Sequence, residues 1–224
     1  MCSGGATGGK KNEKSKENNK LKCFYTNCDT FLNKKDELLA RISPNEPDVI
    51  QLTEINPKQF RFAITDAELY IKGYNHFTSN LTTGRGVLTL VKTKQDFDQL
   101  PCETKDMVWC SCTTNSGKIL IGNVYRSPNN SPEENDEFFE TIRKMVESEG
   151  KDATVIVTGD FNLNMINWKE RSATCIGRTL LNLIDDLGME QLIDFNTRVR
   201  GHDTPSLLDL IITNNPENIC NIES

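Results

Sequence analysis

Histidine is scarce in this sequence, and paired cysteines are missing. Only two histidines occur, His76 and His202, and none of the eight cysteines forms a Cys-x-x-Cys pair. Zinc sites are built from these residues at such spacings, so a zinc site is not expected. The cysteines stand at positions 2, 23, 28, 102, 110, 112, 175 and 220, which does not suggest a compact disulfide framework. A reducing intracellular compartment, cytoplasmic or nuclear, is therefore the expected setting.

Long apolar runs are missing as well. No stretch approaches the roughly 20 apolar residues that a membrane-spanning helix needs, and the N-terminus lacks the apolar segment of a signal peptide. The hydrophobic share is 36%, and the mean hydropathy is −0.51. We therefore expect no membrane partner, and the 224 residues suit one domain or one domain with a tail.

An excess of positive charge is also absent, since 26 Lys and Arg against 32 Asp and Glu give a net charge of −6. This balance argues mildly against strong non-specific binding to nucleic acid. It does not exclude a nuclease, because an acidic metal site itself adds negative charge. Residues 1–20 differ: they have almost no apolar side chains and a net charge of +3. We expect a disordered tail there, either simply solvated or acting as a basic arm or nuclear address.

The rest of the chain alternates strand and helix patterns. The clearest helix begins after Ser131, an N-cap, with Pro132 at the first helical position and Glu134 completing a capping box. Apolar stripes predict further helices over 33–42 and 174–187. Strands are expected over 21–26, 48–53, 86–91, 108–113, 118–125 and 206–212. This alternation predicts an α/β protein whose sheet faces are covered by helices.

The most informative segment is 154–162, Thr-Val-Ile-Val-Thr-Gly-Asp-Phe-Asn. Its β-branched run predicts a buried strand that Gly159 ends. Because side chains alternate along a strand, Asp160 and Asn162 face one side while Phe161 faces the other. A carboxylate that accepts a proton beside an amide that holds an oxyanion suits the hydrolysis of a phosphate ester. The alternative is that the two residues only form a turn after the strand.

Polar residues also mark the ends of other predicted strands. They are Asn27 and Asp29 after the first strand, Glu54 after the second, Tyr125 and Arg126 at the end of 118–125, and Asp209 inside 206–212. Each has a plain structural alternative. Asn27 and Asp29 could cap the following helix, Tyr125 could place its ring in the core, and Arg126 could be a solvated strand-end residue. A buried Asp209 in an apolar strand is harder to explain without a function.

These segments, in this order, resemble the endonuclease/exonuclease/phosphatase superfamily, and in detail the endonuclease domain of non-LTR retrotransposons. The segments that carry the likeness to that branch are Tyr25–Asn27 with Asn33–Leu38, Pro47–Ile50, Gly73-Tyr74, Tyr125–Pro128, and Thr197-Arg198 before Ser206–Leu210. The resemblance covers residues 21–224. It implies a two-sheet β-sandwich flanked by helices, a four-layer αββα arrangement.

The resemblance also implies roles. Glu54 is expected to bind Mg²⁺ or Mn²⁺, with Asn27 and Asp29 near the metal and its waters. Asp160 is expected to activate the attacking water, Asn162 and Tyr125 to contact the scissile phosphate, and Arg126 to hold a backbone phosphate. Asp209 is expected to orient a catalytic histidine. No small-molecule cofactor is expected, and DNA is the expected partner.

One feature of the family is not found. A terminal Asp-His pair follows the Asp209 strand in such proteins, and the sequence as given ends at Ser224 before it. We therefore expect a domain over 21–224 without that segment, and weak activity. His202 does not match the histidine's position, and His76 is expected at the surface or in a loop. The two interpretations are a metal-dependent DNA-nicking endonuclease fragment and an inactive relic that acts as a binding module. A phosphatase or abasic-site repair enzyme is a third.

Overall fold

The computed structural model describes residues 20–79, 81–199 and 204–224. The predicted tail, except for Lys20, and the loop that contains His202 lie outside the described residues. The helices are α1 (Phe31–Ile42), α2 (Asp66–Leu69), α3 (Pro132–Glu149) and α4 (Cys175–Asp186), with a 3-10 turn, η2 (Pro216–Asn218), near the end. The strands are β1 (Cys23–Asn27), β2 (Val49–Thr53), β3 (Tyr74–Thr78), β4 (Val87–Lys92), β5 (Asp98–Leu100), β6 (Met107–Thr114), β7 (Gly117–Tyr125), β8 (Ala153–Asp160), β9 (Glu190–Gln191) and β10 (Asp209–Thr213).

The strands form two sheets. One has four strands in the order β1-β2-β4-β3, and the other has six in the order β5-β6-β7-β8-β10-β9. Each sheet contains one parallel pair, β1 with β2 and β7 with β8. The connections within these pairs are α1 and α3, because parallel neighbours need a long crossover.

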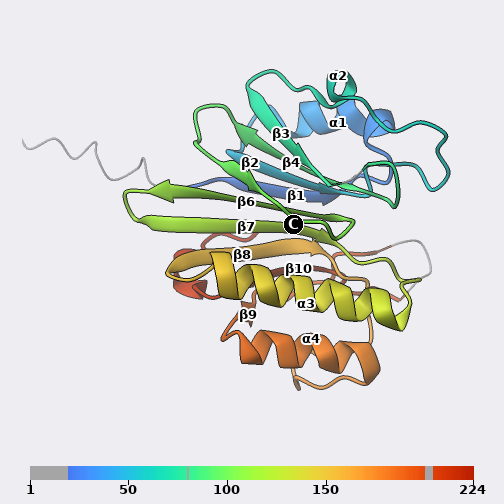
Figure 1. Cartoon of the computed structure of the whole chain (residues 1–224), viewed down its shortest axis with the longest axis vertical. Coiled ribbons are helices and arrows are strands. Elements are labelled where there is room, and N and C mark those ends of the chain that lie inside the picture. The colour runs from blue at the N-terminus through green and yellow to red at the C-terminus, as the bar shows by residue number, and fades with distance from the viewer. Residues whose placement is uncertain (1–19, 80, 200–203) are drawn as a thin grey trace, which may run out of the picture.

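The two sheets lie face to face, with α1 and α2 over the outer face of the four-stranded sheet and α3 and α4 over that of the six-stranded sheet (Figure 1). The predicted α/β sandwich with helices on both outer faces is therefore confirmed. The strongest helix signal is confirmed too, since Ser131 and Glu134 exchange both hydrogen bonds of the capping box at the start of α3.

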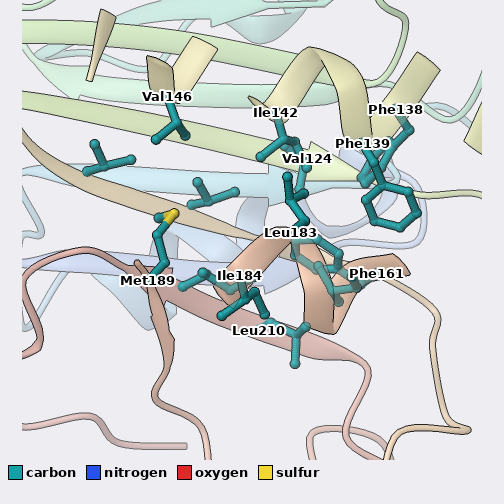
Figure 2. Close-up of a cluster of buried hydrophobic side chains, with 14 of the residues drawn as sticks. Val124, Phe138, Phe139, Ile142, Val146, Phe161, Leu183, Ile184, Met189 and Leu210 are labelled. Atoms are coloured by element: carbon teal, nitrogen blue, oxygen red, sulfur yellow. The ribbon is translucent and has the colours of Figure 1, made fainter. Parts of the chain in front are cut away.

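The largest apolar core fills the space between the six-stranded sheet and its two helices (Figure 2). Helix α3 contributes Phe138 and Ile142, and α4 contributes Leu183 and Ile184. Phe161 is fully buried there, with its ring edge-on to that of Phe138 at a centroid distance of 5.9 Å. The alternation that was predicted around Asp160 therefore holds, because Phe161 packs into the helical layer.

Buried polar side chains join the two sheets. The Asn123 amide on β7 donates to the carbonyl oxygens of Leu52 and Leu88, at 3.2 and 3.0 Å, in the opposite sheet. Gln51 on β2 donates to the Gly122 carbonyl at 3.0 Å in return. Because a buried amide without a hydrogen-bond partner lowers the stability of the fold, these bonds fix the packing of one sheet against the other. The bonds therefore fix the positions of the strand ends that carry the candidate site residues, those of one sheet relative to those of the other.

The strand predicted over 206–212 needs a correction. In the structure β10 begins at Asp209, and Ser206 forms only an isolated bridge with Arg198. The apolar residues before Asp209 suggested a strand. In the structure the Ser206 backbone pairs with residues 197–198, and the Leu208 carbonyl accepts from the N–H of Phe161, the residue after β8, so that the ladder between β8 and β10 starts only at Asp209. Strand β3, on which His76 lies, was not predicted, and neither were the short elements α2, β5 and β9. None of the helices in the described ranges is long and apolar enough to cross a membrane.

Candidate active site

A groove of about 2150 Å³ runs along β1, at the edge of the four-stranded sheet, and over β8 and β10 of the other sheet. The carboxyl ends of β1, β2, β7 and β8 and the start of β10 open into it. The groove is lined by six of the predicted site residues that stand at these ends, namely Asn27, Glu54, Tyr125, Asp160, Asn162 and Asp209, and also by Asp29. The structure thus brings together residues that lie up to 182 positions apart in the sequence, since 209 − 27 = 182.

The strand register places Asp160 at the centre of this group. Tyr125 is its partner on one side, across the parallel β7–β8 pair, and Asp209 is its partner on the other, across the antiparallel β8–β10 pair. Asp160 is only 5% exposed. Its two carboxylate oxygens accept hydrogen bonds from the Asn162 backbone N–H at 3.0 Å and from the Asn27 side-chain amide at 3.1 Å.

These surroundings change the acidity of Asp160. Burial, followed by the negative charges of Asp209 and Glu54, raises the pKa of its carboxyl from 3.8 to about 7, although the two hydrogen bonds oppose the rise. A carboxylate with such a pKa accepts a proton near neutral pH much more readily than an ordinary aspartate. The site therefore contains a group suited to act as a general base.

Three residues at the rim of the site have a left-handed backbone. The φ angles are +43° at Asp29, +54° at Glu54 and +51° at Asn162. Such angles are uncommon for residues other than glycine and cluster where a structure fixes a side chain for a function. Here each follows a strand end, so the chain turns sharply and directs the polar side chain toward the groove.

The predicted metal ligands share a cation that the sequence did not suggest. One guanidinium nitrogen of Arg85, Nη2, donates to Asp29 Oδ1 at 2.7 Å and also to Glu54 Oε2. Two carboxylates, whose oxygens are hard donors, therefore converge on the guanidinium of Arg85. Within the described ranges, no group of three or more His, Cys, Asp or Glu side chains is arranged to hold a metal ion. Mg²⁺ usually needs only one or two protein carboxylates besides water and a substrate phosphate, so the pair fits that ion.

Asp209 has a hydrogen-bond partner that the resemblance did not imply. The Tyr25 hydroxyl donates to Asp209 Oδ1 at 2.6 Å and lies 3.2 Å from the Thr53 hydroxyl. Burial raises the pKa of Asp209 despite the hydrogen bond from Tyr25, and burial followed by Asp209 raises the pKa of the Tyr25 hydroxyl. Among the described residues, the side chains of Tyr25 and Thr197 hold this carboxylate, and its expected role beside a histidine stays a prediction.

Arg126 also lies differently from the expectation. It is 5% exposed, and its guanidinium donates to the Asn135 side chain at 2.8 Å and to the backbone oxygens of Phe161 and Asn162 at 3.2 and 3.4 Å. The Asn162 amide donates back to the Arg126 carbonyl at 2.9 Å. With its donors directed inward, Arg126 fixes the loop after β8 and does not face a phosphate in the groove.

His76 is not part of the site. Its Nε2 lies 3.4 Å from the exposed Asp66 carboxylate, and it does not line the groove.

Tyr125 stays protonated in the site. Burial, followed by the nearby Glu54 and Asp160 carboxylates, raises the pKa of the Tyr125 hydroxyl, so Tyr125 stays a hydrogen-bond donor at neutral pH.

The raised pKa of Asp160 predicts a stability effect. Between pH 4 and 7 the folded protein holds a proton on Asp160 that the unfolded chain, with a pKa near 3.8, has lost, so stability falls as the pH rises through this window. In Asp160→Asn this loss is absent. As the pH rises from 5 to 8 in EDTA, the free energy of unfolding of the variant should therefore increase by about 2 kcal/mol relative to that of the wild type. The lost Asn27 hydrogen bond costs about 1 kcal/mol, but equally at both values of pH.

Urea unfolding at both values of pH tests this effect. Asp186→Asn, a change at an exposed residue of α4 that pairs with Arg143 at 2.7 Å, is the control, and its stability relative to the wild type should not change with pH. A difference for Asp160→Asn that stays constant from pH 5 to 8 would show that the carboxyl titrates normally in the folded protein.

Comparison with known proteins adds to this geometry. Residues 119–224 match the family described as "Endonuclease-reverse transcriptase". Among solved structures, the endonuclease domain of TRAS1, a telomere-specific non-LTR retrotransposon, is similar with 19% identity and a TM-score of 0.65, over 88% of this chain and 86% of that chain. The chain has the endonuclease/exonuclease/phosphatase fold. The resemblance that the strand-end motifs suggested is thereby confirmed.

Two other neighbours show the breadth of this fold. The 3′ phosphatase NExo from Neisseria, solved with a product DNA hairpin, has 16% identity and a TM-score of 0.67, over 89% of this chain and 88% of that chain. The AP endonuclease LMAP from Leishmania major has 14% identity and a TM-score of 0.63, over 86% of this chain and 78% of that chain. Comparison with curated protein sequences gives no match.

The sequence did not predict the roles of two residues of the site, Tyr25 and Arg85. Tyr25 was part of a recognised motif but received no role, and Arg85 received none although Gly84 and Gly86 flank it. Glycines on both sides of an arginine indicate a tight turn that presents one charged side chain. That pattern was the available signal for Arg85, whereas nothing in the sequence pairs Tyr25 with Asp209.

Proposed function

We propose that this protein is a divalent-metal-dependent phosphodiesterase that nicks DNA inside the cell, as an endonuclease associated with a reverse transcriptase. The observation that carries the proposal is the position of Asp160. This buried carboxyl with a raised pKa lies in a groove whose nearby strand ends supply the side chains of Asn27, Glu54 and Tyr125. A base, a cation site and neutral hydrogen-bond donors are the groups that hydrolysis of a phosphodiester needs.

Each residue then has a role at a stated atom. Asp160 accepts the proton of the attacking water on its carboxylate, which the Asn27 amide and the Asn162 N–H hold in place. The Tyr125 hydroxyl and the Asn162 amide donate to the phosphate oxygens. Glu54 and Asp29 would hold Mg²⁺ or Mn²⁺, which supplies charge neutralisation at the phosphate. Tyr25 keeps Asp209 in place beside Asp160.

The walls of the groove support DNA as the partner. Besides Arg85, the groove is lined by eight basic residues: Lys20, Lys22, Lys34, Arg41, Lys58, Lys94, Lys118 and Arg198. Apart from the carboxylates of the site itself, only three acidic residues of the described ranges line the groove: Asp96, Glu217 and Glu223. Although the chain is acidic as a whole, positive charge therefore prevails along the groove outside the site, where it can neutralise backbone phosphates. NExo, which has the same fold, is solved with a DNA hairpin.

A second candidate function is a DNA-binding module without catalysis. Two observations favour it: no histidine lines the groove among the residues that the structure describes, and Arg85 already pairs with the carboxylates that a metal would need. Because no histidine lines the described part of the groove, we expect nicking by the protein to be slow.

A phosphatase is a further alternative. It would release phosphate from a DNA 3′ end without opening a circular plasmid.

The test uses supercoiled plasmid and a matched pair of variants. Glu54→Gln should reduce Mg²⁺-dependent nicking by at least about tenfold, because the amide is a much poorer ligand for Mg²⁺. Glu140→Gln, at an exposed residue of α3 that pairs only weakly with Lys144 at 3.7 Å, should nick at the wild-type rate. Equal rates for the two variants would remove Glu54 from the proposal.

A further inference from the structure

We propose that Arg85 gates the cation site: its guanidinium occupies the position between Glu54 and Asp29, and a divalent ion binds only after the guanidinium moves onto a DNA phosphate. This inference rests on the proposed function in that it takes Glu54 and Asp29 as the ligands of the metal. It makes metal binding and DNA binding cooperative, with Arg85 as the residue that couples them.

The Arg85 guanidinium contacts two carboxylates and a carbonyl oxygen, which are the kinds of ligand that a bound metal ion would have. Nη2 bridges Asp29 and Glu54, and Nη1 donates to the Asn56 carbonyl at 2.6 Å. The Arg85 side chain is 12% exposed and that of Glu54 is 17% exposed, so the pair is largely shielded from water. Shielding strengthens attraction between opposite charges and repulsion between like charges. A divalent ion at Glu54 and a guanidinium at the same oxygen therefore exclude each other.

The backbone around Arg85 is fixed. The Arg85 carbonyl accepts from the Asn56 N–H at 2.8 Å, and the Gly86 N–H donates to Asp106 Oδ1 at 2.6 Å. Gly84 and Gly86 have φ angles of +75° and +69°, and a Cβ on Gly84 would lie 2.6 Å from the Asp106 carboxylate. Since the turn is held on both sides, any release of the carboxylates comes from rotation of the Arg85 side chain.

The groove supplies an alternative partner for that side chain. Arg85 lines the groove together with Glu54 and Asp160, where the proposed function places the DNA backbone. A guanidinium forms paired hydrogen bonds with a phosphate as well as with a carboxylate. DNA in the groove therefore competes with the carboxylates for Arg85, and each ligand that binds favours the other by the same factor.

The experiment measures Mn²⁺ binding by electron paramagnetic resonance of the free ion, which needs no catalysis. Arg85→Gln should bind Mn²⁺ about tenfold or more tightly than the wild type, because the competing charge is gone. A short DNA duplex should tighten Mn²⁺ binding by the wild type more than that by Arg85→Gln, because a DNA phosphate can join the metal ligands in both proteins but displaces a guanidinium only in the wild type. Arg143→Gln, which removes a partly exposed charge on α3 that is paired with Asp186, should behave like the wild type in both measurements.

The outcomes separate this inference from the proposed function. Tighter Mn²⁺ binding by Arg85→Gln without nicking by the wild type would support the gate and reject the nuclease. Unchanged Mn²⁺ affinity in a folded Arg85→Gln, or a DNA effect of equal size in both proteins, would overturn the gate even if the wild type nicks. Should Arg85→Gln fail to fold, Arg85→Met takes its place, because it also removes the competing charge and keeps a long unbranched side chain. It must bind Mn²⁺ more tightly than the wild type; equal or weaker binding overturns the inference.

Discussion

Asp160→Asn is expected to reduce the rate of Mg²⁺-dependent DNA nicking by at least about 100-fold, because it removes the proposed general base. The amide is nearly the same size as the carboxylate, and its oxygen can still accept the Asn162 N–H bond that Asp160 accepts at 3.0 Å. The loss would therefore come from the missing proton acceptor and not from a displaced loop. Single-turnover nicking of supercoiled plasmid, with enzyme in excess, measures the effect.

Asp186→Asn is the matched control, since it makes the same chemical change at an exposed residue of α4, a helix that covers the outer face of the six-stranded sheet (Figure 1), and Asp186 does not line the groove. It should nick at the wild-type rate. DNA binding by Asp160→Asn, measured by fluorescence anisotropy, should be equal to or tighter than that of the wild type, because a negative charge has left the groove. Nicking by Asp160→Asn within threefold of the wild-type rate would contradict the role of Asp160.

Gly159→Ala is expected to destabilise the protein by about 3 kcal/mol or more, a large effect for one methyl group. A Cβ at Gly159 would lie 1.9 Å from the carbonyl oxygen of Val124, on the neighbouring strand. Because that neighbour is backbone, no side-chain rotation relieves the overlap, and β7 and β8 must separate. Chemical denaturation gives the free energy of unfolding for comparison with the wild type.

Gly188→Ala serves as the control for this prediction. Gly188 has a φ of +60° and nothing within 4 Å of an added Cβ, so its cost is only that of a left-handed alanine, about 1 kcal/mol. Equal losses at Gly159 and Gly188 would mean that β7 and β8 are not packed as described. Because Tyr125 and Asp160 are paired across these same strands, a folded Gly159→Ala should also nick more slowly.

Local signals in the sequence predicted much of the fold. The capping box of Ser131 and Glu134 predicted the start of α3, and the β-branched run before Gly159 predicted the strand that carries Asp160. In both cases the residues that determine the structure are neighbours in the chain. The start of β10 could not be predicted in this way, because Leu207 and Leu208 are as apolar as the residues of the strand, and it is the pairing with β8 that begins at Asp209.

The candidate site was predictable only in part, for the same reason. The ends of strands indicated Asp160, Glu54 and Tyr125, which line one groove. The partners of these groups come from distant segments: Arg85 reaches Glu54 across 31 residues, and Tyr25 reaches Asp209 across 184. The expected role of Arg126 was displaced by a local contact that sequence did not show, since Asn135 on α3 holds its guanidinium.

Single-turnover nicking of supercoiled plasmid by the wild-type protein in Mg²⁺, with EDTA added part-way through the time course, shows whether the groove is a metal-dependent site for cleaving DNA. Open circles should accumulate slowly and stop accumulating on chelation. Open circles that keep forming in EDTA would show that cleavage does not need the metal. A folded protein that binds DNA and Mn²⁺ but produces no open circles above the level of Asp160→Asn would show that the groove does not cleave DNA.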